Sequence, residues 1–386
     1  MTSLSDAERL AWLRLSRTQN VGPVTFAQLI ARFGSASAAL QEIPRLVRRG
    51  GGESLRVPSA DEAAREIAAL AKLGGKMIAS GESDFPRGLA AAEPPPPILS
   101  VLGHATLLSR EAIAVVGARN ASALGRRFAG TLAQDLGKAG LVVVSGLARG
   151  IDAAAHEGAL DSGTCAVVAG GVDNIYPPEN AKLYEAIRAQ GCIVSEMPLG
   201  QAPQARHFPR RNRIISGLAR GVVVVEAAEG SGSLITANFA LEQGREIFAV
   251  PGSPLDPRAK GANRLLREGA TLTESAQDVL AGLRPILGHD FREPGHGEPT
   301  PPAAASDAEA DKVRARVEEA LGPAPVPVDE LVRVCGAPVA AVLTILLEME
   351  LAGRIIRHRI VPQSIRLGPR SLPLRGPLAA LGGDDS

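Results

Sequence analysis

Short apolar runs rich in β-branched residues alternate with amphipathic stretches from residue 111 to residue 287. The runs cover 112–116, 141–145, 164–169, 192–195, 221–227 and 246–250. Strands buried on both faces form near-continuous apolar runs, and helices between them connect parallel neighbours. In the stretch 122–139, apolar residues recur at the four-residue spacing of a helix face, at Leu124, Phe128, Leu132 and Leu136. The pattern predicts a doubly wound, Rossmann-like α/β domain with a parallel sheet over 111–287.

Residues 1–75 carry a helical pattern without clear strands. Between the breaks Gly22-Pro23 and Gly34-Ser35, apolar residues follow one helix face, at Phe26, Leu29, Ile30 and Phe33. This predicts a small all-α domain, similar to half of a helix-hairpin-helix or to a SAM-like bundle. The Val21-Gly22 turn has two interpretations, a backbone-amide phosphate site or a plain turn in a helical core. The second is favoured because only one half of the hairpin pattern is convincing.

The remaining segments connect or follow these two domains. Four consecutive prolines within 76–110 predict an extended connector, whose apolar ends join the sheet. Residues 288–310 are rich in Gly, Pro and small polar residues and predict a flexible linker. Three helices followed by a hairpin within 311–370 have the order of a winged-helix domain, and 371–386 are expected to be a disordered tail.

The predicted third helix of the winged-helix domain, 338–352, has only Glu348 and Glu350 as charges. A helix that reads the major groove needs polar or basic side chains. We therefore expect that this helix does not read duplex DNA. Basic residues follow it in the predicted hairpin, at Arg354, Arg357, His358 and Arg359, which favours a weak backbone contact or a protein contact.

The composition narrows the class of protein. With 386 residues, 45% of them hydrophobic and 22% charged, the chain has the length of two or three globular domains and is neither disordered nor collagen-like. Lys+Arg 42 against Asp+Glu 41 gives a net charge of +1, so the averaged charge does not indicate a nucleic-acid partner.

The cysteines and the N-terminus bear on compartment and metal binding. Cys165, Cys192 and Cys335 are far apart and lack the spacing of a disulfide framework or a zinc site. We expect no metal, no cofactor and a reducing compartment. The sequence MTSLSDAERL lacks the features of a signal peptide, and the apolar runs are shorter than the roughly 20 residues that a membrane span needs. A cytoplasmic protein is expected.

Three successive strand-to-helix loops are suited to close backbone approach to an anion. They contain Gly117 to Arg119, Ser145 to Gly150, and the Gly170-Gly171 turn. In a doubly wound sheet, ligands bind beyond the carboxyl ends of the strands, where helix N-termini attract anions. The loops contain neither GxGxxG nor a Walker motif, so a dinucleotide-dependent oxidoreductase is weakly supported.

The segment between Glu196 and Glu226 has no acidic residue and five arginines, at Arg206, Arg210, Arg211, Arg213 and Arg220. This local excess of positive charge opens a helix, because Pro209 suits a first-turn position. Phe208 lies beside the arginines. An aromatic ring among arginines can stack an unpaired base while the guanidinium groups hold phosphates, so the segment favours single-stranded DNA binding.

Other polar positions carry weaker signals. A Gly/Ser turn from Ser231 to Ser233 opens another helix, and Lys260 and Asn263 follow the final strand. His156 has two interpretations, a general base or a surface or capping histidine, and the second is favoured. Because no spacing suggests a nucleophile or a carboxylate pair, no catalytic residue is assigned.

Several segments in this order resemble the DNA-processing protein A (DprA, also called Smf) family. They are IAVVGARNAS, VVVSGLARGIDAAAHEGAL, GGVDNIYPPEN, HFPRRNRIISGLARGVVVVEA, SGSLITANFALEQGREIFAVPGS and KGANRLLREGA, within 105–285. The resemblance also accounts for the SAM-like and winged-helix flanks. It implies a non-enzymatic single-stranded DNA-binding protein of natural transformation that protects incoming strands, loads a RecA-type recombinase and acts as a homodimer.

The residues matched to the family agree with the positions reached from the loops. The resemblance implies strand contacts at Arg119, 145–150, Gly170-Gly171 and 208–213. The complete candidate DNA-binding set is Gly117, Arg119, Ser145, Gly146, Arg149, Gly150, Gly170, Gly171, Phe208, Arg210, Arg211, Asn212, Arg213, Gly232, Ser233, Lys260 and Asn263.

Two questions stay open in the sequence. A nucleoside-monophosphate phosphoribohydrolase is the alternative function, because the Gly/Ser turn at Ser231 is followed by a helical Glu242. Leu265 and Leu266 are candidates for the dimer surface, and a place in the core is at least as well supported for both.

Overall fold

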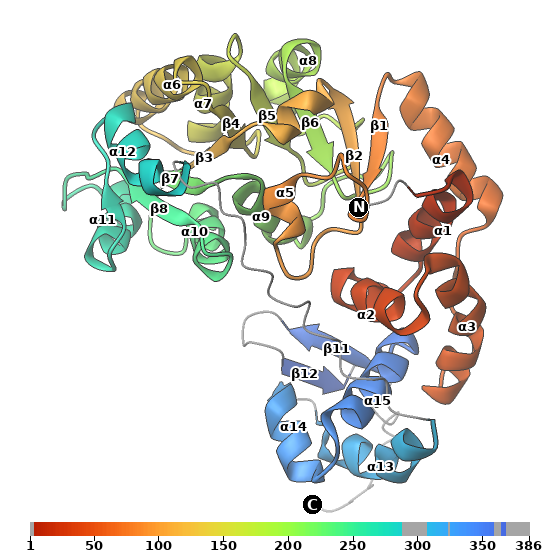
Figure 1. Cartoon of the computed structure of the whole chain (residues 1–386). Coiled ribbons are helices and arrows are strands. Elements are labelled where there is room, and N and C mark those ends of the chain that lie inside the picture. The colour runs from red at the N-terminus through yellow and green to blue at the C-terminus, as the bar shows by residue number, and fades with distance from the viewer. Residues whose placement is uncertain (1–3, 288–306, 323–324, 359–363, 368–386) are drawn as a thin grey trace, which may run out of the picture. The chain divides into compact units, whose positions relative to one another are not determined.

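The computed structural model describes residues 4–287, 307–322, 325–358 and 364–367 (Figure 1). The chain divides into two compact units. The larger unit contains Met1–Leu13 and Ser59–Glu293, and the smaller contains Arg14–Pro58 and Pro294–Ser386. The first helix, α1 (Asp6–Arg17), crosses the boundary between them.

The larger unit is built on a nine-stranded sheet. Its strands are β1 (Lys76–Ala79), β2 (Ile98–Gly103), β3 (Ala112–Val116), β4 (Val142–Ser145), β5 (Thr164–Val167), β6 (Cys192–Ser195), β7 (Gly221–Val224), β8 (Glu246–Ala249) and β9 (Thr271–Leu272). Their order is β1-β2-β6-β5-β4-β3-β7-β8-β9. Neighbours from β6 to β9 are parallel, and β1 and β2 are added antiparallel at one edge. The predicted doubly wound sheet is confirmed, and the apolar ends of the proline-rich connector join it.

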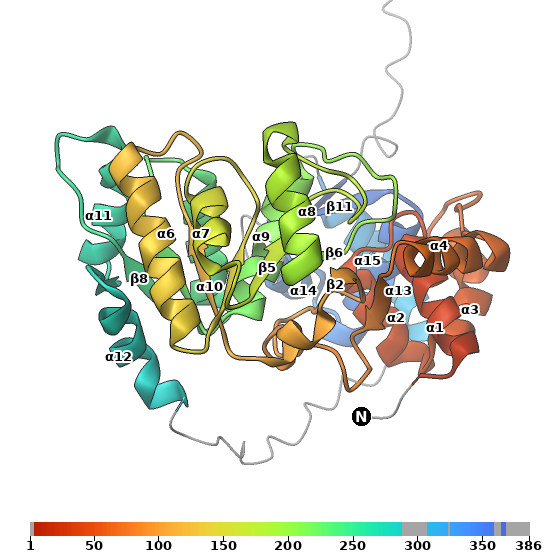
Figure 2. The same cartoon turned by 90° about the horizontal axis from the view of Figure 1, so that it is seen from above.

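Helices cover both faces of this sheet, and Figure 2 shows α6, α7 and α8 side by side over one face. That face packs α6 (Ala123–Lys138), α7 (Ile151–Ala159), α8 (Ala181–Gln190) and α12 (Ala276–Leu287). The opposite face packs α5 (Arg87–Ala90), α9 (His207–Leu218), α10 (Gly232–Glu242) and α11 (Lys260–Arg267). In β3, Ile113 and Val115 point to the first face while Ala114 and Val116 point to the second. Both faces are therefore apolar, as the continuous runs predict.

One expectation for the helix 122–139 was wrong. Leu132 and Leu136 are buried under α6 and Phe128 packs at its edge, but Leu124 is 77% exposed. Leu124 lies in the first turn, directly after the N-cap Ser122, whose side chain accepts a hydrogen bond from the Gly125 N–H. Capping fixes the start of this helix, and the apolar contact with the sheet begins one turn later.

The smaller unit combines N-terminal helices with a winged-helix domain. From the N-terminal part come α2 (Pro23–Phe33) and α3 (Ala36–Arg49). The winged-helix part contains α13 (Asp307–Ala320), α14 (Val328–Cys335), α15 (Val339–Leu351), and the sheet β10 (Val326–Pro327), β12 (Ser364–Leu367), β11 (Ile355–His358), in that order. The predicted series of three helices and a hairpin is confirmed. The remaining helix, α4 (Ala60–Lys72), belongs to the larger unit.

The predicted linker 288–310 and tail 371–386 lie outside the described residues, except that α13 begins at Asp307. Within the described ranges, no single helix has the length and apolar content of a membrane span. Only α14 and α15 taken together have that length and composition, and the two helices are bent by 118° relative to each other.

Candidate functional site

The crevice in which a Rossmann fold usually binds a nucleotide lies at the switch point of the sheet, here between β3 and β7. In this chain the crevice is occupied by a carboxylate. Glu226, just beyond β7, accepts hydrogen bonds from the Ser122 N–H at 2.9 Å and from the Ser122 hydroxyl at 2.5 Å. A Cβ added at Gly125 would lie 2.5 Å from Glu226 Oε1. The N-terminus of α6 is therefore satisfied by the protein's own anion, which leaves no place for a nucleotide phosphate.

A second internal carboxylate lies one strand further along the sheet. Asp152, in the first turn of α7, is buried and accepts the N–H groups of Gly146 at 3.1 Å and Ala148 at 3.4 Å. The Gly117 N–H is a third donor to the same carboxylate. The sequence predicts that these loop amides meet an external anion. They instead meet Asp152, which fixes two loops against each other.

Arg211, from α9, supplies the neighbouring positive charge. Burial raises the pKa of Asp152, and the charge of Arg211 and the amide donors oppose that rise. Burial lowers the pKa of Arg211 to about 10, so the guanidinium remains charged at neutral pH. A Cβ at Gly146 would lie 1.5 Å from Arg211 Nη1, so glycine is required for this approach. Among the described residues, Arg211 Nε has no hydrogen-bond partner.

A cavity of about 190 Å³ opens beside Arg211 at the carboxyl ends of β3, β4 and β5. It is lined by two further arginines, Arg119 and Arg149, and by the aromatic residues Tyr176 and Phe208. The Arg119 guanidinium lies over the Phe208 ring, 5.2 Å from its centroid. Tyr176 and Phe208 have centroids 5.6 Å apart and planes tilted by 55°. The opening therefore offers cations and aromatic surface together, which suits a ligand that is flat and anionic.

The arginine-rich segment is less positive in the structure than in the sequence. Arg213 is buried against Glu196, and Arg210 lies 3.9 Å from the same carboxylate. Arg220 forms a two-bond pair with Glu111, at 2.5 and 3.0 Å. The expected excess of positive charge was therefore overestimated, because acids outside the segment neutralise part of it.

The predicted residues fall into two groups. Those that line the cavity are Arg119, Gly146, Arg149, Gly170, Phe208 and Arg211. Several others are used internally. The buried Ser145 hydroxyl donates to Val115 O at 2.6 Å, and the Gly171 N–H donates to Gln201 O at 2.9 Å. Their positions stabilise the loops without lining the opening.

Gly117, Gly150, Arg210 and Arg213 do not line this cavity, and five further candidates, Asn212, Gly232, Ser233, Lys260 and Asn263, lie elsewhere. Asn212 donates to Gly232 O at 3.1 Å, which ties α9 to the start of α10. The Ser233 N–H is within 3.4 Å of the N-cap Ser231 hydroxyl. Asn263 donates to Gly252 O at 2.8 Å and accepts its N–H at 3.1 Å, bracing a loop beside the exposed Lys260.

Sequence reasoning did not single out Tyr176 or Asp152. An aromatic residue before Pro177-Pro178 in the third loop and an acid directly after a glycine turn were the available signals. For His156, neither interpretation fits: it is fully buried, and its Nδ1 lies 2.7 Å from Thr164 Oγ1. Burial, with the charge of Arg211, lowers the pKa of His156 to about 3, so the ring is neutral.

Two further expectations concern residues outside the cavity. Leu265 is buried in the core and Leu266 packs against it, so the core interpretation is confirmed for this pair. Glu242 is the exposed last residue of the eleven-residue helix α10, about 16 Å from its Ser231 N-cap by helix rise. The two cannot share one small substrate. Among the described side chains, no group of three His, Cys, Asp or Glu residues could hold a metal ion.

Fold and site together define a Rossmann-like domain whose nucleotide crevice is closed by Glu226 and whose open cavity is arginine-rich and aromatic. Three family models match the chain: DNA recombination-mediator protein A over residues 76–284, the DprA-like N-terminal HHH domain over 6–69, and the DprA winged helix domain over 301–359. The chain belongs to the DNA processing protein A (DprA/Smf) family.

Individual relatives extend over most of the chain. Protein Smf of Escherichia coli (strain K12) is 36% identical over 350 residues, which is 89% of this chain and 92% of that protein. DNA processing protein DprA of Bacillus subtilis (strain 168) is 43% identical over 233 residues, 60% of this chain and 78% of that one.

Two solved structures are similar to the chain. DNA processing protein A from Streptococcus pneumoniae has a TM-score of 0.61 at 31% identity, covering 72% of this chain and 98% of that one. DNA processing protein A from Helicobacter pylori has a TM-score of 0.51 at 29% identity, covering 55% and 96%. The second structure concerns the single-stranded DNA binding mode of that protein.

Proposed function

We propose that this protein binds single-stranded DNA at the cavity lined by Arg119, Arg149, Arg211, Tyr176 and Phe208 and transfers the strand to a RecA-type recombinase during natural transformation or recombination. The observation that carries the proposal is the cavity itself, where three arginines and two aromatic rings converge. The binding mode described for the H. pylori relative supports the choice of ligand.

The chemistry of the cavity matches an unpaired strand better than a free nucleotide or a duplex. A volume of about 190 Å³ is small beside the roughly 300–1,000 Å³ of most small-molecule sites, so a larger cofactor would not be enclosed. A base that is not paired can stack on an aromatic ring, and guanidinium groups can hold the adjacent phosphates. Such contacts carry little base information, so we expect binding without sequence preference.

The proposal includes a homodimeric, cytoplasmic and non-enzymatic protein. The family resemblance supports each of these points, and the separation of Glu242 from the Ser231 turn weighs against the phosphoribohydrolase alternative. Incubation with nucleoside monophosphates should release no free base. Sedimentation velocity should give a dimer mass, and a stable monomer at micromolar concentration would contradict the dimer.

The binding proposal is tested by fluorescence anisotropy with a labelled oligothymidylate and a duplex of equal length. We expect preference for the single strand and an affinity that falls with salt. An Arg119→Ala/Arg149→Ala protein should bind weakly, while Arg65→Ala/Arg284→Ala, which removes two exposed arginines from α4 and α12, should bind as the unmodified chain does. Arg213 is unsuitable for substitution here because it is buried against Glu196.

Transfer to a recombinase needs its own assay. Strands coated with a single-strand-binding protein resist RecA filament formation, and the complete chain should shorten the delay. If the chain binds the strand but the delay is unchanged, the DNA-binding proposal stands and the transfer proposal is lost.

A further inference from the structure

The third helix of the winged-helix domain, α15, has little free surface. One side of it, including Val342, Ile345 and Met349, packs into the core of its own domain. The N-terminal helix α3 lies against α15 as well. A Cβ added at Gly50, just after α3, would lie 2.1 Å from Glu348 O, and one at Gly52 would lie 3.1 Å from the Ala352 Cβ. The two backbones therefore touch where both helices end.

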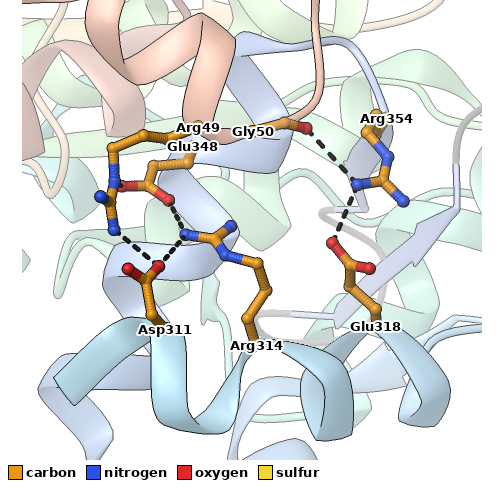
Figure 3. Close-up of polar contacts among 7 residues, drawn as sticks. All are labelled: Arg49, Gly50, Asp311, Arg314, Glu318, Glu348 and Arg354. Carbon is orange, nitrogen blue, oxygen red and sulfur yellow. Dashed lines mark hydrogen bonds and ion pairs between the residues drawn. The ribbon is translucent and has the colours of Figure 1, made fainter. Parts of the chain in front are cut away.

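A group of charged side chains joins these segments at one end of the contact (Figure 3). Arg49 of α3 donates to Glu348 Oε1 at 3.1 Å and to Asp311 Oδ1 at 2.8 Å. Arg314 of α13 donates to the second Glu348 oxygen and lies 3.4 Å from Asp311. Glu348 has no exposed surface, and both of its carboxylate oxygens are paired with these two arginines inside the protein. One of the two comes from the N-terminal segment.

Further polar contacts lie beside this group, at the C-termini of α3 and α15. Arg354 donates to Glu318 at 2.9 Å and reaches Gly50 O at 3.5 Å, as Figure 3 shows. The Asn20 side chain donates to Leu351 O, at the C-terminus of α15, at 3.2 Å. Asn20 adopts a left-handed conformation, with φ 62°, in the turn before α2. This side chain therefore supplies a donor to one of the carbonyls that a helix C-terminus leaves free.

The turn beside Asn20 is the one considered as a phosphate site. The Val21 N–H donates within the chain to Thr18 O at 3.1 Å. The turn contributes Asn20 to the contact with α15, which fits a structural turn better than an anion-binding one.

We propose that α15 is a protein-binding helix and that its ligand is the segment Arg14–Pro58 of the same chain. The other side of α15 presents a buried carboxylate, Glu348, among apolar neighbours. This surface suits a helix such as α3, whose last turn carries an arginine. The same face would repel the phosphates of duplex DNA. The winged-helix domain thus holds the N-terminal helices in place, and its third helix does not enter a major groove.

A cysteine pair reports the docking in the complete chain. Gly52→Cys/Ala352→Cys places two Cβ atoms close to the roughly 3.5–4.5 Å that a disulfide needs, since the present separation is 3.1 Å. The native cysteines are all buried and should not compete. With oxidised glutathione, the pair should form an intramolecular disulfide that changes mobility on a non-reducing gel.

Arg49→Glu in the cysteine-pair background should slow disulfide formation about tenfold or more, because the new carboxylate would face the buried Glu348 and the exposed Asp311. Arg48→Glu is the matched control, since it makes the same charge change at an exposed neighbour in the last turn of α3. Arg49→Lys keeps the charge but not the forked guanidinium geometry. It should form the disulfide at a rate between those of the Arg49→Glu and Arg48→Glu proteins.

The outcomes separate clearly. Equal rates for Arg49→Glu and Arg48→Glu, or a disulfide that links two chains, would overturn docking within one chain. If Arg49→Glu slows the disulfide and also raises duplex affinity tenfold, the released helix binds DNA and the protein-binding assignment is lost. Slower disulfide formation with unchanged duplex affinity supports the proposal, and none of these results depends on single-strand binding.

Discussion

Truncation of Phe208 to alanine is the most direct test of the cavity. Phe208 is the ring that contacts both Arg119, at 5.2 Å, and Tyr176, at 5.6 Å. Stacking of a base on an aromatic side chain contributes about 1–3 kcal/mol. Loss of that contact should therefore raise the Kd for single-stranded DNA by roughly 5- to 150-fold.

Arg119 lies over the same ring, so the two side chains should also be coupled in their effects on DNA affinity. A cation–π contact at a partly exposed site contributes about 0.5–1 kcal/mol, so Phe208→Ala and Arg119→Ala should not be additive by about that amount. The salt dependence should distinguish the two changes. Each phosphate contact on a single strand contributes about 0.7 to the slope of log K against log salt. Arg119→Ala should lower the slope by that value, and Phe208→Ala should leave it unchanged.

Anisotropy titrations at three salt concentrations provide the assay. Phe239→Ala is the matched control, because Phe239 is a half-buried phenylalanine on α10 that does not line the cavity. Thermal melts of both variants establish that they are folded. A Phe208→Ala protein that is folded and binds the strand as tightly as the Phe239→Ala protein would refute the stacking argument.

Three further predictions concern stability. Gly146→Ala should lower the unfolding free energy by about 3–5 kcal/mol in a denaturant titration, since its Cβ displaces Arg211 from Asp152, whereas Gly232→Ala, with nothing within 4 Å, should not. His156 has a folded pKa of about 3, below its unfolded value of about 6.5. The unfolded chain therefore binds the proton first, and the stability of the folded protein decreases as the pH is lowered. Between pH 7 and pH 5 this loss is about 2 kcal/mol, and a His156→Gln protein with the same pH slope would contradict it. Glu226→Ala should cost about 1–3 kcal/mol and make the melting temperature rise with added phosphate, because the N-terminus of α6 becomes free; no phosphate effect would count against a filled crevice.

The sequence predicts the architecture well because burial on both faces leaves a strong local signal. The runs of Val and Ile in β3, β4 and β7 need no knowledge of their neighbours to be recognised. The edge strand β9 has only two residues. It was not predicted because it lacks such an apolar run. Leu124 was misplaced because a cap and an apolar stripe compete for the same turn.

The site was predicted in part. The loops that surround the cavity were identified, because turns after parallel strands meet at one edge of the sheet. The charge of the arginine-rich segment was overestimated, because Glu196 at its boundary pairs with Arg213, and Glu111 and Asp152, which face other arginines, are distant in sequence. Pairing between distant residues is set by the fold, and a single sequence carries no local trace of it.

The internal carboxylate of Asp152 has a kinetic consequence. Because Asp152 already holds the amides of two loops, a strand bound as proposed would find the backbone already arranged and would form no hydrogen bonds to those buried amides. Under the proposed function, the strand would be held by separate, exposed contacts that exchange one nucleotide at a time. The proposed transfer to a recombinase requires this property, because a filament growing along the strand would displace the protein progressively.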